Sequence, residues 1–324
     1  MKTERDRNKM GKDEEREKVI HSVSEFVANV ESFQQTIPSM QNIGCFTMFR
    51  GQANKDWPLM PSLYRQDLLQ GEQLLIKYLQ HSCPDEFSNS RFDTLVKLQH
   101  FGLPTRLLDT TTNPLVALYF ACKSDRQMDS DGVVYVFPNL PVMWSNDPLI
   151  ELIMDFVFCF GNYRIDLQHA LNNMAPKYNN AYSRLIPHDI KSLLHYLTAP
   201  ALAVMPEKSN KRILAQDGAF FLCGMKVAAK EISTNPGTRG REYYIFEPVE
   251  IKGSTAVWSK AESIIIPSTA KETILRQLDV MGVNEAKLFP DLQHQANHAV
   301  EYVKRNIHIR IQAEKETDSK LEQP

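Results

Sequence analysis

The chain has 324 residues, of which 43% are hydrophobic and 23% are charged, and its formal net charge is -2. This composition is that of an ordinary globular protein, long enough for one large domain or two small ones. The absence of a basic excess argues against a nucleic-acid binder. Without a signal-peptide pattern or a long apolar run, we expect a cytoplasmic protein without a membrane partner.

The first part of the chain predicts a charged arm, a helix and a strand, in that order. Residues 1–17 mix charges of both signs and carry little apolar surface, so we expect a flexible arm. Apolar residues from Val19 to Phe33 recur at helical spacing. The short apolar segment Cys45–Arg50 predicts a strand that brings Arg50 to its end, directly before Gly51.

The middle of the chain predicts further helices around short strands. Residues 73–98 have helical spacing with interruptions, and Arg106–Asp109 is extended. Turn-forming residues at Thr110–Asn113 precede a helix that runs from Pro114 to Cys122, because proline suits the first helical turn. Gly132 opens another strand, and we consider residues 145–200 a candidate helical insertion.

The last part of the chain predicts strands followed by helices. Residues 210–224 are interpreted as strand, turn and strand, and residues 243–246 and 263–266 as two more strands. A helix over 271–281 ends before Gly282, a second covers 292–306, and residues 311–324 form a disordered tail. The sequence therefore predicts an α+β fold, with a short-stranded mixed or antiparallel β core surrounded by helices, over residues 18–310.

Arg50 is the first candidate for chemistry. A guanidinium group at a strand end offers a fork of donors that matches a phosphate or a carboxylate. Gly51 would let a ligand approach the backbone closely. The alternative is that Arg50 pairs with a carboxylate such as Asp109 and only stabilises the fold.

The segment His100–Asn113 is the second candidate. It places His100, Arg106, Asp109 and the threonines Thr110–Thr112 ahead of a helix, whose free N–H groups would suit an anion. The alternative is local, because Asp109 or Thr112 would cap the helix and Arg106 would pair with Asp109.

Two further groups have simpler interpretations. Gln216 and Asp217 lie between apolar runs, where a turn carries polar residues in any case. His294 and His298, near Asp291, have metal-compatible spacing but lack a further ligand, so we expect a solvated helix face and no metal site. The five cysteines are far apart and form no CxxC pair.

Four ordered motifs of this sequence resemble the FRG-domain family over roughly residues 40–300. They are FRGQ with the pattern W-x-L-x-P-S-L-x-R at Trp57–Arg65, QHFGLPTRLLDTTTNPLVALYFA at Gln99–Ala121, NKRILAQDGAFFL at Asn210–Leu222, and the segment Ile264–Leu292. One departure from the family pattern is Thr110, where the family usually has an aromatic residue after LLD.

Three features together also resemble the arrangement in arginine–serine–glutamate ADP-ribosyltransferases: Arg50–Gly51 at the end of a first strand, a threonine-rich second strand at Thr110–Thr112, and the following helix VALYFA. This resemblance implies an ADP-ribosyltransferase-like fold with NAD as substrate. The resemblance implies that Tyr119 or Phe101 packs on nicotinamide, and that Gln216 stands where a glutamate is expected, with Glu242, Glu247 and Glu262 as alternatives. The expected catalytic set is Arg50, Thr111, Gln216 and Glu262. The expected nucleotide-binding set is Arg50, Gly51, His100, Arg106, Asp109, Thr110, Thr111, Thr112 and Tyr119.

Such an enzyme would act as a bacterial toxin or in phage defence. The alternative is a sensor domain that binds NAD or another nucleotide without turnover, because an amide at Gln216 cannot supply the negative charge of a catalytic glutamate.

Overall fold

The structure of this protein is a computed structural model that describes residues 18–36, 44–87, 90–124, 126–160, 163–178, 189–208, 210–251, 261–291, 295–296, 299–300 and 303. The expected arm at 1–17, the tail at 311–324, and both His294 and His298 lie outside the described residues. Among the helices that the structure describes, none has the length and apolar character needed to cross a membrane.

The core is a seven-stranded sheet that curls into a barrel-like shape. Its strands, in spatial order, are β1 (Lys18–Val19), β10 (Glu262–Ile266), β4 (Gly132–Trp144), β2 (Cys45–Gln52), β3 (Leu107–Thr111), β7 (Gly218–Cys223) and β6 (Ala201–Met205). An additional parallel pairing of β6 with the far half of β4 joins the two sides of the sheet. The β1–β10 pair is also parallel, and the other pairs are antiparallel.

Strand β4 shows why the sheet has two hydrophobic faces. Its apolar run VVYVF is buried throughout, and successive side chains point to opposite faces of a strand. Val134 and Val136 therefore join one core cluster, while Val133, Tyr135 and Phe137 join the other. A strand that is buried on both faces requires helices on both sides.

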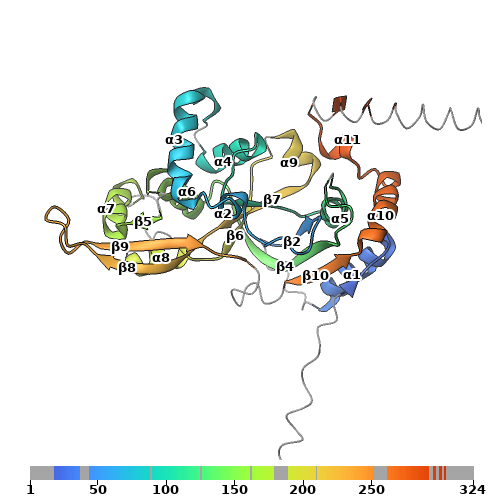
Figure 1. The fold of residues 1–324 in the computed structure, drawn as a ribbon, viewed down its shortest axis with the longest axis horizontal. Helices are drawn as coiled ribbons and strands as arrows, with labels where there is room; N and C mark the ends of the chain where they lie inside the picture. Colours follow the sequence, from blue (N-terminus) through green and yellow to red (C-terminus); the bar gives the residue numbers. More distant parts are fainter. Residues whose placement is uncertain are drawn as a thin grey trace, which may run out of the picture.

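The helices divide between these two faces (Figure 1). One face is covered by α1 (Val23–Thr36), α5 (Pro114–Cys122), α10 (Ser268–Val280) and α11 (Glu285–Leu288). The other is covered by α2 (Ser62–Arg65), α3 (Glu72–Ser82), α4 (Arg91–His100), α6 (Pro148–Phe160), α7 (Leu167–Tyr178), α8 (Ile190–Leu197) and α9 (Lys211–Ala215). Two 3-10 turns, η2 (Leu69–Gly71) and η3 (Pro84–Glu86), flank α3.

A second sheet of three strands lies beside α7 and α8, on the side of the molecule opposite β10 and α10 (Figure 1). Its antiparallel strands are β5 (Arg164–Ile165), β9 (Glu242–Pro248) and β8 (Met225–Ile232). Helices α6, α7 and α8 and strand β5 account for most of the described part of the candidate insertion at 145–200. Strands β8 and β9 come from later in the chain.

The mixed α and β character is confirmed, but three local predictions are wrong. Residues 211–215 form helix α9 where a strand was expected, because the Asn210 side chain accepts a hydrogen bond from the Arg212 amide at 2.8 Å and caps a helix. Strand β2 continues to Gln52, so Arg50 lies inside the strand. Thr110 and Thr111 belong to β3, and no turn begins before Thr112.

Candidate functional site

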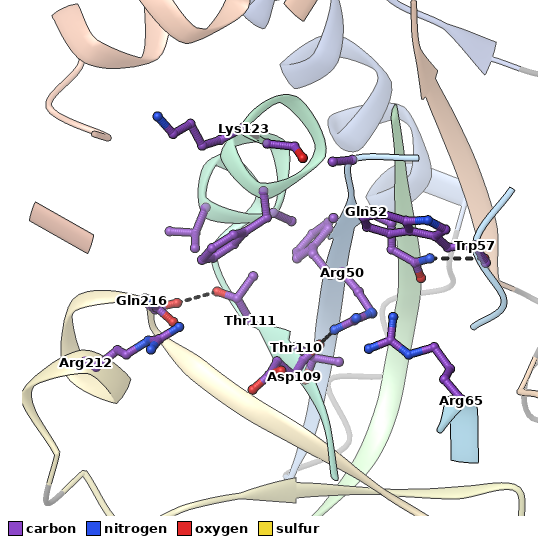
Figure 2. Close-up of a pocket in the computed structure, with 17 residues that line it drawn as sticks. Arg50, Gln52, Trp57, Arg65, Asp109, Thr110, Thr111, Lys123, Arg212 and Gln216 are labelled. Carbon is purple, nitrogen blue, oxygen red and sulfur yellow. Dashed lines mark hydrogen bonds between the residues drawn. The ribbon is translucent and has the colours of Figure 1, made fainter. Parts of the chain in front are cut away.

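A cavity of about 310 Å³ opens between β2, β3 and α5 (Figure 2). It brings together Arg50 and Gly51 from β2, Asp109, Thr110 and Thr111 from β3, and Gln216 after α9. Sequence segments that are more than a hundred residues apart thus meet in one place, as the motifs predict. A smaller adjoining cavity shares Asp109, Thr110, Arg212 and Gln216 with it, and His100 lines that second cavity.

Arg50 lies opposite Tyr135 in the β2–β4 pairing and points into the cavity. Its Nη1 donates a hydrogen bond to the backbone oxygen of Asp109 at 2.5 Å, whereas its buried Nε has no partner among the described residues. Burial lowers the pKa of Arg50; the charge of Asp109 opposes this shift and the neighbouring guanidinium of Arg65 adds to it. Arg50 is therefore a desolvated cation with a donor still to be satisfied.

Gly51 serves helix packing, which explains this glycine without a ligand. A Cβ at this position would lie 1.9 Å from the backbone oxygen of Ala117 and 2.7 Å from the amide of Ala121, both in α5. Only a residue without a side chain allows α5 to lie this close to β2. Gly51 still lines the cavity through its backbone.

The three threonines have different roles. Thr110 is buried and lines both cavities, and its Oγ1 contacts the Met48 sulfur at 3.9 Å. Thr111 lines the main cavity, and its Oγ1 donates to the backbone oxygen of Gln216 at 2.7 Å. Thr112 lines neither of these two cavities, and its amide donates to the backbone oxygen of Asp217 at 3.0 Å.

The start of α5 is capped by the protein itself. The Asn113 side chain accepts a hydrogen bond from the Leu115 amide at 3.0 Å, and Pro114 occupies the first helical position. The cap is thus Asn113, where Asp109 or Thr112 was expected. Because the Asn113 side chain already accepts from one of the free N–H groups, this helix start is a poorer anion site than the sequence suggested.

Helix α9 places Arg212 and Gln216 on the far side of the cavity from Arg50 (Figure 2). The Arg212 guanidinium lies 4.7 Å from the centre of the Phe289 ring. Burial lowers the pKa of Arg212, and the carboxylates of Asp109 and Asp291 oppose this shift. The Gln216 amide donates to the backbone oxygen of Leu288 at 3.0 Å, so the end of α11 holds this wall in place.

Cations outnumber carboxylates among the described residues that line the cavity. Arg50, Arg65, Lys123 and Arg212 are cationic, and Asp109 is the single carboxylate. Lys123 also pairs with Glu285 at 3.2 Å, and Asp109 accepts a hydrogen bond from Gln99 at 2.8 Å. An excess of positive charge on a partly enclosed surface favours an anionic ligand.

Arg106, an expected ligand residue, is buried elsewhere. It is 1% exposed, and its Nε donates to Glu72 Oε1 at 2.7 Å while its Nη2 pairs with Glu72 Oε2. The expected pairing with Asp109 is also wrong, because successive strand residues alternate between faces and Arg106 lies just before β3. Arg106 is part of the core.

Tyr119 and the candidate glutamates also lie away from the cavity. Tyr119 is buried in the core cluster beside α5, and the next residue, Phe120, lines the cavity in its place. Glu262 pairs with Lys18 at the β1–β10 edge of the sheet. Glu242 and Glu247 lie in the second sheet, where they pair with Lys230 and Lys226.

Among the residues that line the cavity, sequence reasoning did not propose Trp57, Arg65, Phe120, Lys123 or Arg212 as site residues, nor did it propose Gln52. Trp57 and Arg65 belong to the motif at Trp57–Arg65, and Arg212 belongs to the motif at Asn210–Leu222, so motif membership was the available signal. Phe101, the other aromatic candidate for nicotinamide, is 74% exposed and lines neither cavity.

The comparison with protein families agrees with this arrangement, because the family model of the FRG domain matches residues 46–130. This chain carries an FRG domain. The matched residues of the FRG domain supply β2, β3 and α5, and with them most of the cavity lining, whereas Arg212 and Gln216 come from beyond the match. Comparison with curated proteins and with solved structures finds no match.

Proposed function

We propose that the FRG domain binds a phosphate-bearing nucleotide or an NAD-like molecule in this cavity. The observation that carries the proposal is the charge of the lining, in which Arg50, Arg65, Lys123 and Arg212 face a single carboxylate. Guanidinium groups match the oxygens of a phosphate, and the Arg50 Nε still lacks an acceptor in the described structure.

Isothermal titration tests this proposal with ADP, ADP-ribose and NAD as charged ligands and adenosine as the uncharged comparison. Each phosphate contact of Arg50 adds a charge-assisted hydrogen bond, so Arg50→Gln is expected to weaken ADP binding about ten- to hundred-fold. Arg276→Gln is the matched control, since Arg276 is an exposed arginine that does not line the cavity. Equal affinity for adenosine and ADP, or no binding of any of these ligands, would contradict the proposal.

A second candidate function is cleavage of NAD by an ADP-ribosyltransferase-like domain, through which a toxin or a phage-defence protein would act. Two observations favour it. Strands β2 and β3 pair with Phe49 opposite Thr111, which sets Arg50 beside the threonine-bearing strand as the resemblance implies. Asp109 also supplies a carboxylate at the cavity, and a fixed negative charge stabilises a developing oxocarbenium ion.

Nicotinamide release from labelled NAD distinguishes the enzyme from the sensor. If the enzyme is correct, the wild-type protein releases nicotinamide, and Asp109→Asn slows release by about a hundred-fold or more because the amide lacks the charge. If the protein is a sensor, NAD binds and is recovered intact. Release that Asp109→Asn does not slow would remove Asp109 from the mechanism.

A further inference from the structure

Gln52 is a buried polar residue at the cavity whose role the phosphate contacts do not explain. It is 3% exposed and lines the cavity two residues after Arg50, so both side chains leave the same face of β2. Its Nε2 donates a hydrogen bond to the backbone oxygen of Trp57 at 3.1 Å. Figure 2 shows this bond and the Gln52 amide below the Trp57 ring.

The hydrogen bond fixes which way the Gln52 amide faces. A backbone carbonyl oxygen only accepts, so the amide nitrogen must be the atom directed at Trp57. The amide oxygen, Oε1, then points away from this bond, and it has no hydrogen-bond partner within the described part of the chain. A buried acceptor without a donor is unfavourable, which makes a donor on a bound ligand the natural partner.

Trp57 is held beside this acceptor by its own loop. The Trp57 amide donates to the backbone oxygen of Asn54 at 3.3 Å, and the Lys55 amide donates to that of Asp131 at 2.8 Å. The side chain is 37% exposed and lines the cavity. An indole ring held at a cavity wall is a surface on which a nucleobase stacks.

We infer that Trp57 and Gln52 form a nucleobase subsite that selects a base carrying an amino group. The base stacks on Trp57, its amino N–H donates to Gln52 Oε1, and the phosphates extend to Arg50 and Arg65. This inference rests on the proposed function, and it adds the class of base to the phosphate contacts.

Binding of two matched ligand pairs tests the subsite in the full chain. The pairs are ADP with purine riboside 5′-diphosphate, and CDP with its 4-deamino analogue, and each pair differs only in the amino group. In the pair that binds more tightly, loss of the amino group is expected to weaken binding about ten-fold, which corresponds to one hydrogen bond. Affinities within two-fold in both pairs would overturn the inference while leaving the phosphate site intact.

The 2′-deoxy and 3′-deoxy forms of ADP separate a base contact from a ribose contact. The subsite predicts that both deoxy forms bind as tightly as ADP. If a deoxy form binds ten-fold more weakly while the ligands without the amino group do not, Gln52 contacts a ribose hydroxyl and the base assignment is overturned. If neither ADP nor CDP binds while ADP-ribose does, the subsite is also wrong, whereas failure of every ligand refutes the proposed function itself.

Variants assign the selectivity to the two residues. Gln52→Met removes the acceptor and is expected to abolish the difference within each pair. Both Trp57 variants keep the backbone oxygen that orients Gln52, so the difference within each pair remains. Trp57→Phe keeps a ring for stacking, whereas Trp57→Ala loses it and weakens both members of a pair equally. Circular dichroism of each variant confirms that it folds, and a Gln52→Met protein that folds and keeps the ten-fold difference would overturn the assignment.

Discussion

The two arginines that the sequence singled out, Arg50 and Arg106, have opposite surroundings near strand β3. Arg106 is 1% exposed and meets both carboxylate oxygens of Glu72. Arg50 donates to a backbone oxygen and is repelled by the charge of Arg65, and its buried Nε has no acceptor in the described structure. One cation is neutralised inside the protein, and the other is not.

The pKa directions express the same difference. Burial acts against the charge of both arginines. At Arg106 the charge and the hydrogen bond of Glu72, together with neighbouring Tyr64 and Cys223, outweigh burial and raise the pKa, whereas burial prevails at Arg50 and lowers its pKa. A buried guanidinium whose charge is balanced by its own carboxylate is not available to a ligand. The position of the counter-charge therefore separates a core arginine from a binding arginine, and each prediction below tests that separation.

The largest loss of stability is expected from Glu72→Gln, which removes the counter-charge of Arg106. The substitution leaves Arg106 buried without a counter-charge, and such a loss costs about 3–5 kcal/mol of unfolding free energy. Urea denaturation measures it. Glu86→Gln is the matched control, because Glu86 pairs with Lys97 at the surface and such a pair contributes about 0–1 kcal/mol. Similar losses in the two variants would mean that the buried pair is not special.

Sequence motifs predicted much of the site because they mark strands that lie next to one another. Arg50, Thr111 and Gln216 were all selected before the fold was known, and all three line one cavity. The partner of Arg106 could not be predicted, because Glu72 lies on a separate helix and nothing in its local sequence distinguishes it from an exposed glutamate.

Helix α5 shows why the aromatic residue was misplaced by one position. Its sequence PLVALYFAC is apolar on every side, so hydrophobic spacing cannot say which face turns to the cavity. Tyr119 was chosen, but Phe120 lines the cavity. Arg65, Lys123 and Arg212 were missed for a related reason, since charged residues on short helices and loops are brought together only by the tertiary fold.

The next largest loss of stability is expected from Gly51→Ala, which tests how closely α5 packs on the strand that carries Arg50. A Cβ lying 1.9 Å from the Ala117 oxygen would force α5 away from β2, at a cost of about 3 kcal/mol, the upper part of the usual range for overpacking. Thermal or urea unfolding measures the loss. Gly71→Ala is the matched control, because an added Cβ meets no atom within 4 Å there and φ is negative. A stable Gly51→Ala protein that lost ligand binding would restore a ligand role for the glycine.

The smallest change in stability is expected from Arg50→Gln, which tests whether the arginine at the cavity contributes to the fold as Arg106 does. The variant loses the hydrogen bond to the Asp109 oxygen, but it also relieves the burial of a charge and the repulsion from Arg65. Since these terms oppose one another, we expect the unfolding free energy to change by less than about 1 kcal/mol. Urea denaturation of the ligand-free protein, beside Glu72→Gln, gives the value. A loss as large as that of Glu72→Gln would make Arg50 a structural residue like Arg106, and the cavity would then lack its central anion-binding group.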